Sequence, residues 1–120
     1  MTEQTPWPKE LRVSKDRRTL TVTFDAGDPI ELSAEYLRVV SPSAEVQGHS
    51  ADQRKTVPGK RSVAIQHMEP VGNYAVRIIF DDGHQTGIFS WPYLQKMGVE
   101  REAFWGGYLA EMEAQGLSRG

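Results

Sequence analysis

The sequence contains no cysteine among its 120 residues. The chain therefore forms no disulfide, and it offers neither a thiolate for a metal ion nor a cysteine nucleophile for catalysis. It also has no apolar run of the length that a membrane-spanning helix needs, and its first residues lack the apolar core of a signal peptide. We therefore expect a cytoplasmic protein that is not embedded in a membrane.

An excess of positive charge is also missing. Lys and Arg number 14, Asp and Glu number 16, and the net charge is −2. This balance gives no general attraction to nucleic acid or to an anionic membrane surface, so neither is an expected partner. With 38% hydrophobic and 25% charged residues, the composition is typical of a globular protein, and the length is that of one domain.

Alternating apolar and polar residues indicate antiparallel strands. Leu20–Phe24 alternates in this way and predicts a half-buried strand, with Leu11–Val13 as its partner in a first hairpin. Arg61–Glu69 and Tyr74–Phe80, separated by a turn at Pro70–Asn73, predict a second hairpin whose return strand is the most apolar of the chain. We expect an α+β domain of antiparallel β-hairpins with short capped helices.

The two halves of the chain share a pattern. Phe24–Gly27 matches Phe80–Gly83, and each copy is followed by a serine, Ser33 or Ser90, that can cap a helix. The Asp-Gly pair in the second copy predicts a tight hairpin turn with positive φ at Gly83. This similarity is explained either by convergent turn and cap chemistry or by a pseudo-twofold pair of hairpin–helix units. Both explanations predict the same local structure.

The domain limits follow from composition. Residues 1–8 are polar and proline-rich and form the expected lead-in, residues 9–98 form the expected domain, and residues 99–120 form a C-terminal helix and tail packed on it. The segment 41–60 is rich in polar residues, Gly and Pro, and predicts a long loop. Gly98 is expected to end a short helix near Met97.

The final helix, expected over Glu100–Ala114, carries an aromatic stripe. Such a stripe is typical of a core face, but it can also form a docking surface for a protein partner. We take Trp105 and Tyr108, together with Trp91, as the docking candidates. Gly106-Gly107 weakens this helix, so we expect close packing or a kink there.

Three histidines could support catalysis only if tertiary folding gathered them. His84 is next to Asp81 and Asp82, and with His49 and His67 it could form a metal site for a hydrolase. No pair of histidines has the spacing of a dedicated metal motif, and the two aspartates point to opposite faces if they lie on a strand. A turn histidine hydrogen-bonded to a neighbour is the simpler interpretation of His84.

A second candidate is a basic loop. Arg54, Lys55, Lys60 and Arg61 flank a Pro-Gly turn and could bind a small anion or a nucleotide. A solvated loop whose charge is balanced by nearby acids is the alternative. Stacking aromatics, which a nucleic-acid site would add, are not evident around these residues.

Several stretches together resemble a known family. Residues 81–94 read Asp-Asp-Gly-His-x-x-Gly-Ile-Phe-Ser-Trp-x-Tyr-Leu, and Tyr36-Leu37-Arg38 lies upstream. Supporting stretches are Trp7-Pro8-x-x-Leu11, Ser41–Glu45, Val57–Arg61 and Glu69–Tyr74. The combination resembles the γ-butyrobetaine hydroxylase-like N-terminal domain, a family that includes small stand-alone bacterial proteins of unknown function.

The resemblance implies a zinc site that this chain has lost. In the hydroxylases the domain holds a structural zinc through three cysteines and one histidine, whose positions correspond here to Ser41, Ser43, Val46 and His84. Hydroxyls and a valine cannot replace thiolates on zinc, so we expect no metal and no other cofactor.

The resemblance also bears on function. In the hydroxylases a separate 2-oxoglutarate/iron domain carries the chemistry, and related domains are appended to Mrp-type P-loop ATPases that carry iron–sulfur clusters. It therefore implies a non-catalytic interaction or accessory module that serves a metalloenzyme or an iron–sulfur pathway through an unidentified protein partner. The sequence predicts no particular oligomeric state.

Overall fold

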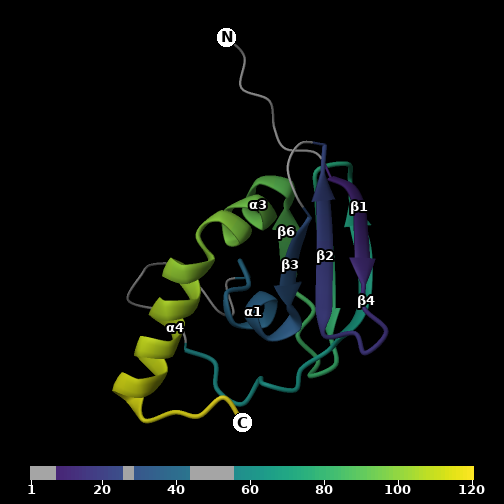
Figure 1. The fold of residues 1–120 in the computed structure, drawn as a ribbon. Coiled ribbons are helices and arrows are strands. Elements are labelled where there is room, and N and C mark those ends of the chain that lie inside the picture. Colours follow the sequence, from purple (N-terminus) through teal and green to yellow (C-terminus); the bar gives the residue numbers. More distant parts are fainter. Residues whose placement is uncertain (1–7, 26–28, 44–55) are drawn as a thin grey trace.

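Two three-stranded antiparallel sheets and a set of helices make up the protein in the computed structural model, which describes residues 8–25, 29–43 and 56–120 (Figure 1). The first sheet has the order β1–β2–β3, with bounds Pro8–Val13, Thr19–Phe24 and Ile30–Ser33. The second has the order β4–β5–β6, with bounds Ile65–Val71, Ala75–Phe80 and Gly87–Ser90. The helices are α1, Ala34–Val39, α3, Trp91–Val99, and α4, Arg101–Gln115. The α+β prediction is confirmed.

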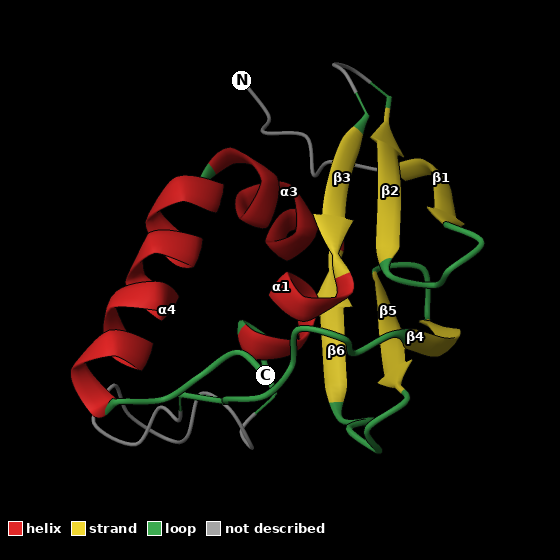
Figure 2. Ribbon diagram, turned by 60° about the horizontal axis from the view of Figure 1, so that its bottom comes forward, coloured by secondary structure: helices red, strands yellow, loops and turns green. Residues whose placement is uncertain are grey.

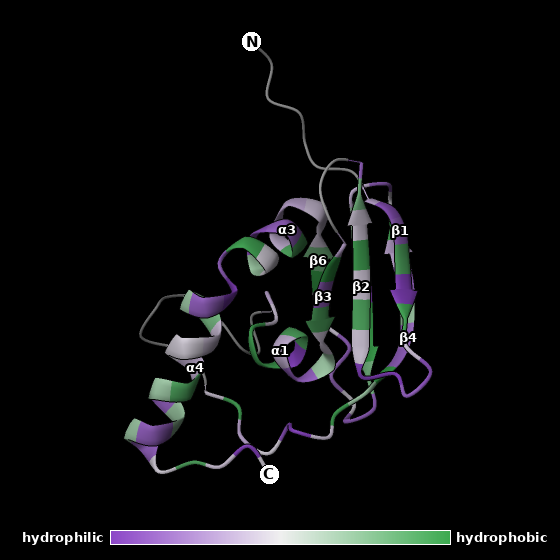
Figure 3. Ribbon diagram, viewed as in Figure 1, coloured by the Kyte–Doolittle hydropathy of each residue, from purple (hydrophilic) through white to green (hydrophobic). Residues whose placement is uncertain are grey.

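The first sheet follows the alternation in its sequence. Strand β2 pairs with β1 and β3, placing Leu11 opposite Val22 and Leu20 opposite Leu32. Every second residue of β2 is buried, which confirms the predicted half-buried strand. Figure 3 shows the same alternation of apolar and polar residues along β2.

The second sheet is shifted relative to the prediction. Strand β4 begins only at Ile65, because residues 60–63 form a turn in which the Val63 N–H donates to the Lys60 carbonyl. The strand continues through Val71, so the hairpin turn is Gly72–Tyr74 and not Pro70–Asn73. Gly72 has φ +55°, which favours a glycine at the turn. Strand β5 lies between β4 and β6 and buries four of its six residues, as its apolar sequence predicts.

Both sheets lead into a serine-capped helix. Ser33 and Ser90 have nearly the same extended backbone, with φ/ψ of −70°/152° and −71°/158°. The Ser33 hydroxyl accepts the Tyr36 N–H at 3.0 Å, and the Ser90 hydroxyl accepts the Tyr93 N–H at 3.3 Å. The two halves therefore share the predicted strand followed by a serine-capped helix, while their origin as a repeat stays a prediction. Residues 26–28, in the predicted turn of the first half, lie outside the described residues.

The helices lie to one side of the strands. Figures 1 and 2 show α1 and α3 next to the sheets and α4 farther out. The core between these layers is apolar. Its fully buried members include Leu20, Leu32, Leu37, Ile78, Phe80, Phe89, Leu94 and Met97. None of the helices in the part of the chain that the structure describes is long and apolar enough to cross a bilayer.

The helical glycines behave differently from the prediction. Gly98 does not end α3, which continues to Val99; a Cβ at Gly98 would lie 2.7 Å from the Ile30 side chain, so the position needs a small residue. Gly106 and Gly107 are exposed, and a Cβ at either would meet nothing within 4 Å. The expected close packing at this pair is therefore wrong, because the glycines face away from the core.

Candidate functional site

A polar cluster lies where the β5–β6 connection meets the chain that follows α1. Gly83 has φ +94°, and its N–H donates to the Phe80 carbonyl at 3.1 Å. The predicted positive-φ turn is present, but residues 81–86 separate the two strands, so the connection is longer than a tight hairpin. The extra residues carry His84 and Thr86 toward the segment after α1, which local sequence does not predict.

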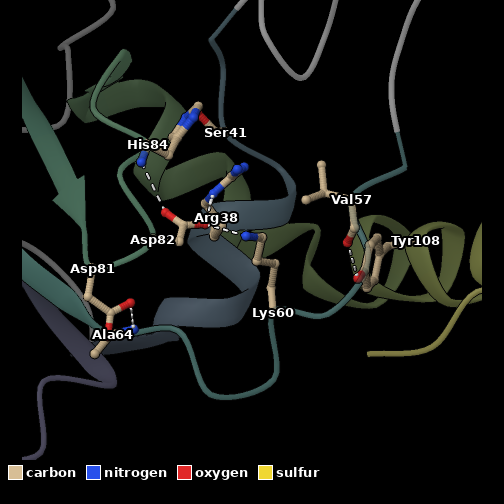
Figure 4. A network of polar contacts seen from close by, with 9 residues as sticks. All are labelled: Arg38, Ser41, Val57, Lys60, Ala64, Asp81, Asp82, His84 and Tyr108. Carbon is tan, nitrogen blue, oxygen red and sulfur yellow. Dashed lines mark hydrogen bonds and ion pairs between the residues drawn. The ribbon is translucent and has the colours of Figure 1, made fainter. Parts of the chain in front are cut away.

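His84 and Ser41 lie at the centre of this cluster. The His84 side chain is 5% exposed, and its Nε2 lies 3.1 Å from the Oγ of Ser41, which is fully buried (Figure 4). The Ser43 N–H donates to the same Oγ at 3.3 Å, and the Ser43 and Thr86 hydroxyls are 2.6 Å apart. We call Ser41, Ser43, His84 and Thr86 the histidine–serine cluster. Its members are hydrogen-bonded to one another inside the protein.

Gly87 lies directly against the histidine–serine cluster. A Cβ at this position would lie 2.6 Å from the Ser41 Oγ and 3.0 Å from the Phe89 ring. Real Cβ atoms do not approach neighbours this closely, so any side chain here would displace Ser41 or Phe89. The glycine therefore lets the backbone of β6 approach the buried serine.

The donor set of the cluster does not fit a structural zinc. Of the four positions that the resemblance implies, Ser41, Ser43 and His84 are brought together, and Val46 lies outside the described residues. They supply one imidazole and two hydroxyls, and one hydroxyl is hydrogen-bonded to that imidazole. Zinc in structural sites takes thiolates and imidazoles, so a hydrogen-bonded cluster stands where the resemblance implies a metal.

Asp82 holds two cations beside the cluster. Its carboxylate accepts the Arg38 Nε–H at 2.8 Å and lies 2.6 Å from the Lys60 Nζ, and its other oxygen accepts the His84 N–H at 3.0 Å (Figure 4). Burial by itself raises the pKa of Asp82, but hydrogen bonds from Lys60, the His84 backbone and Arg38 outweigh it and lower the pKa to about 2. A carboxylate this acidic stays ionised near neutral pH and is a poor general acid or base.

Asp81 does not join Asp82 in one site. Its carboxylate accepts the Ala64 N–H at 3.1 Å, whereas Asp82 binds Arg38 and Lys60 (Figure 4). His67 is exposed on β4, 3.7 Å from a Glu69 oxygen, while His84 is buried beside Ser41.

The groups required for a metal-assisted hydrolase are therefore not gathered. His49, the third histidine of that hypothesis, lies outside the described residues. Within residues 8–25, 29–43 and 56–120, no three histidines or carboxylates form a group that could hold a metal ion.

The two cations of the basic loop that the structure describes have different surroundings. The Lys60 ammonium is paired with Asp82, and Arg61 is exposed while its N–H donates to the Arg119 carbonyl at 2.8 Å. Arg54 and Lys55 lie outside the described residues. The use of the four cations for an anion stays a prediction. Arg38 is a cation that the prediction missed, and its Nη1 is buried without a hydrogen-bond partner in the described part of the chain.

Two of the three docking candidates are buried. Trp91 is 8% exposed and its Nε1–H donates to the Asn73 carbonyl at 2.9 Å. Tyr108 is 5% exposed and its hydroxyl donates to the Val57 carbonyl at 2.7 Å (Figure 4). Both side chains contribute to the core and present little surface to a partner.

Trp105 is the half-buried candidate. Its ring meets Tyr36 edge to face, with centroids 6.0 Å apart. Burial raises the pKa of Tyr36 to about 12, so its hydroxyl remains protonated and donates to the Met97 carbonyl at 2.8 Å. Trp105 also lines an open cavity of about 320 Å³, with Thr19, Glu31, Ser33, Tyr36 and Arg101. This cavity lies between the family-like part of the chain and α4.

Sequence reasoning missed the long-range polar partners of the site. Arg38 and Gly87 lie within the stretches that resemble the family, so the family motif is the signal that could have identified them as site residues. The ion pair between Glu35 and Arg119 joins residues 84 positions apart and had no local signal.

The fold and the cluster together define a small α+β domain in which two serine-capped strand–helix units enclose a histidine–serine network. The chain belongs to the gamma-butyrobetaine hydroxylase-like, N-terminal family, whose model matches residues 11–95. The expected family membership is confirmed. The match ends before α4, so Arg101, Trp105 and the residues that follow lie beyond it.

Solved structures support the same assignment. Two proteins studied by NMR in solution are 40% and 44% identical, with TM-scores of 0.83 and 0.81; the alignments cover 97% and 99% of this chain and 91% and 90% of theirs. A crystal structure of a DUF971-family protein of unknown function from Acidithiobacillus ferrooxidans is 38% identical, with a TM-score of 0.65, over 78% of this chain and 93% of that one. No curated protein matches the sequence. Relatives of unknown function do not indicate a catalytic role.

Proposed function

We propose that this chain is a non-catalytic interaction module of the cytoplasm that serves a metalloenzyme or an iron–sulfur pathway by binding one of its proteins. The observation that carries the proposal is the closure of the polar site. His84 is buried against Ser41, and Asp82 is held ionised by Arg38 and Lys60. Because Ser41 is fully buried and His84 is only 5% exposed, a substrate in solution has little access to them, and Asp82 is an ionised partner of two cations.

The link to a metalloenzyme rests on the family. Its description names the N-terminal part of a hydroxylase-like protein, and the match covers residues 11–95. In the hydroxylases that the sequence resembles, a domain of this kind accompanies a separate catalytic domain. We infer that this domain acts by binding a metalloenzyme or an iron–sulfur protein.

The test is affinity capture from the native cell with two variants of the bait. Trp105→Phe keeps an aromatic ring in the half-buried position but reduces the surface that lines the cavity. Tyr74→Ser is the matched control, since Tyr74 is 57% exposed in the β4–β5 turn and does not line the cavity. Thermal melts of both variants establish that they fold before capture begins.

We expect one metalloenzyme or iron–sulfur protein to be enriched by the unmodified chain and by Tyr74→Ser, and to be reduced by Trp105→Phe. Equal capture by both variants would place the docking surface away from Trp105. If no protein is enriched over a column without bait, or if the purified chain turns over a substrate, the interaction-module proposal is wrong.

A further inference from the structure

The last residues of the chain turn back along an earlier segment. Helix α4 ends at Gln115, its C-cap Gly116 has the left-handed φ of +66°, and the chain then runs next to residues 59–61 (Figure 1). The Gly59 N–H donates to the Ser118 carbonyl at 2.9 Å, and the Arg61 N–H donates to the Arg119 carbonyl at 2.8 Å. Segment 59–61 therefore binds segment 117–120 through backbone hydrogen bonds, which do not depend on the side chains of residues 117–120.

The side chain of Arg119 enters a site that matches a guanidinium. Its Nε and Nη2 donate to the two Glu35 oxygens at 2.8 and 2.7 Å, in a bidentate pair. The Glu35 side chain is only 8% exposed. The Arg119 guanidinium carbon also lies 5.3 Å from the centroid of the Trp105 ring. A carboxylate and an aromatic face together select Arg over Lys, because the planar fork of Arg satisfies both contacts.

The remainder of segment 117–120 is held weakly. Gly116, Leu117, Ser118 and Gly120 are exposed, so little apolar surface is buried when the segment docks. The Arg119 side chain is itself 37% exposed. The segment is held by three backbone hydrogen bonds, one ion pair and one cation–π contact, so it can leave without disturbing the core, which is formed by other residues.

We propose that Glu35, Trp105 and the backbone of residues 59–61 form an arginine-binding groove, which docks an extended, arginine-bearing segment of another protein in place of residues 117–120. We call this surface the arginine groove. The inference deepens the proposed interaction module by naming the partner chemistry, and it rests on that proposal. The chain's own segment then acts as a built-in competitor, since a tethered ligand has an effective concentration in the millimolar range.

The experiment uses the full chain and a blocked peptide, acetyl-Gly-Leu-Ser-Arg-Gly-amide, which repeats residues 116–120 without terminal charges. Arg119→Ala frees the Glu35 carboxylate while leaving the chain otherwise intact. We expect the peptide to bind the Arg119→Ala chain at least tenfold more tightly than the unmodified chain by titration calorimetry. It should also raise the melting temperature of the variant, because binding to the folded state stabilises it.

Two controls separate recognition from simple folding effects. The same peptide with Lys in place of Arg should bind at least fivefold more weakly, since Lys cannot form the bidentate pair. Adding Glu35→Gln to Arg119→Ala should abolish binding if that double variant still melts cooperatively. The Lys peptide keeps the test decisive if it does not.

Absence of binding to Arg119→Ala, or equal binding of the Arg and Lys peptides, would overturn the arginine groove. A concentration-dependent dimer of the unmodified chain that Arg119→Ala abolishes would also overturn it, because the occupant would then be the tail of a second copy. A partner could still be captured by another surface in either case, so failure here is distinguishable from failure of the interaction module.

Discussion

At the scale of single residues, the site depends on two glycines for different physical reasons. Gly83 has φ +94° and open space around it, so a side chain there would strain the backbone without a clash. Gly87 needs no unusual φ, but a side chain there would overlap Ser41 and Phe89. The first glycine shapes the turn that carries His84, and the second makes room for the histidine–serine cluster.

We predict that Gly83→Val destabilises the protein by about 1–3 kcal/mol, the range for forcing a β-branched residue into a positive-φ conformation. Gly83→Asn is the matched control and should cost less, because Asn tolerates positive φ better than other residues. Denaturant unfolding of the three proteins measures the difference. A Gly83→Val variant as stable as the wild type would show that the turn does not need its positive φ.

Asp82 should make stability depend on acid. Its pKa is lowered from the ordinary 3.8 to about 2 in the folded protein, so the unfolded state binds a proton first as the pH falls. The stabilisation by ionised Asp82 is complete above about pH 4 and is lost as the pH falls toward 2. We therefore expect the wild type to lose more free energy of unfolding between pH 4.5 and pH 2 than Asp82→Asn does. Parallel losses in urea unfolding would contradict this assignment.

At the scale of elements, helix α4 packs on the protein through one face and exposes two glycines elsewhere. Tyr108 and Met112 are buried, whereas Gly106 and Gly107 face solvent with open space around them. Glycine lowers helix stability because its backbone is free in the unfolded chain. Nothing in the described packing requires either glycine.

We predict that Gly106→Ala and Gly107→Ala each stabilise the protein by about 0.5–1 kcal/mol, the difference in helix propensity. Gly98→Ala in α3 is the matched control, because its Cβ would approach the Ile30 side chain to 2.7 Å, and it should not stabilise. Thermal and urea melts measure all three. Loss of stability in both α4 variants would mean that something covers this face of the helix.

At the scale of the whole molecule, two sheets and three described helices share one main core without any thiolate metal site to hold them together. The second, smaller core cluster joins Val39 of α1 to Tyr108 and Met112 of α4. Helix α4 and the tail thus pack on the part of the chain that the family model matches. The expected domain limits at residues 8 and 98 stay a prediction.

We predict that the protein folds without metal, because one imidazole and two hydroxyls cannot supply the folding energy of a structural zinc site. The melting temperature should be the same with and without a strong chelator. Elemental analysis of the purified protein is the control for carried-over metal. A drop of several degrees on chelation, reversed by zinc, would show that residues beyond Ser41, Ser43 and His84 complete a site.

The sequence by itself determined the features that depend on neighbouring residues. Alternation at Leu20–Phe24 predicts a strand because successive side chains point to opposite faces, and Ser33 and Ser90 predict helix starts because a cap acts over three residues. The positive φ of Gly83 followed from the Asp-Gly pair for the same reason. These effects are local, so they can be read before the chain is folded.

Only the tertiary structure decided which side chains meet. It joined Ser41 to His84 and Glu35 to Arg119. It buried Trp91 and Tyr108, for which the sequence left a core position and a docking surface as alternatives. It also placed Thr86, in the β5–β6 connection, beside Ser43. Contacts between residues 43 to 84 positions apart depend on how the sheets and helices pack, and packing energy is shared among the whole core. For that reason the elements could be predicted from the sequence, and the polar partners of the site could not.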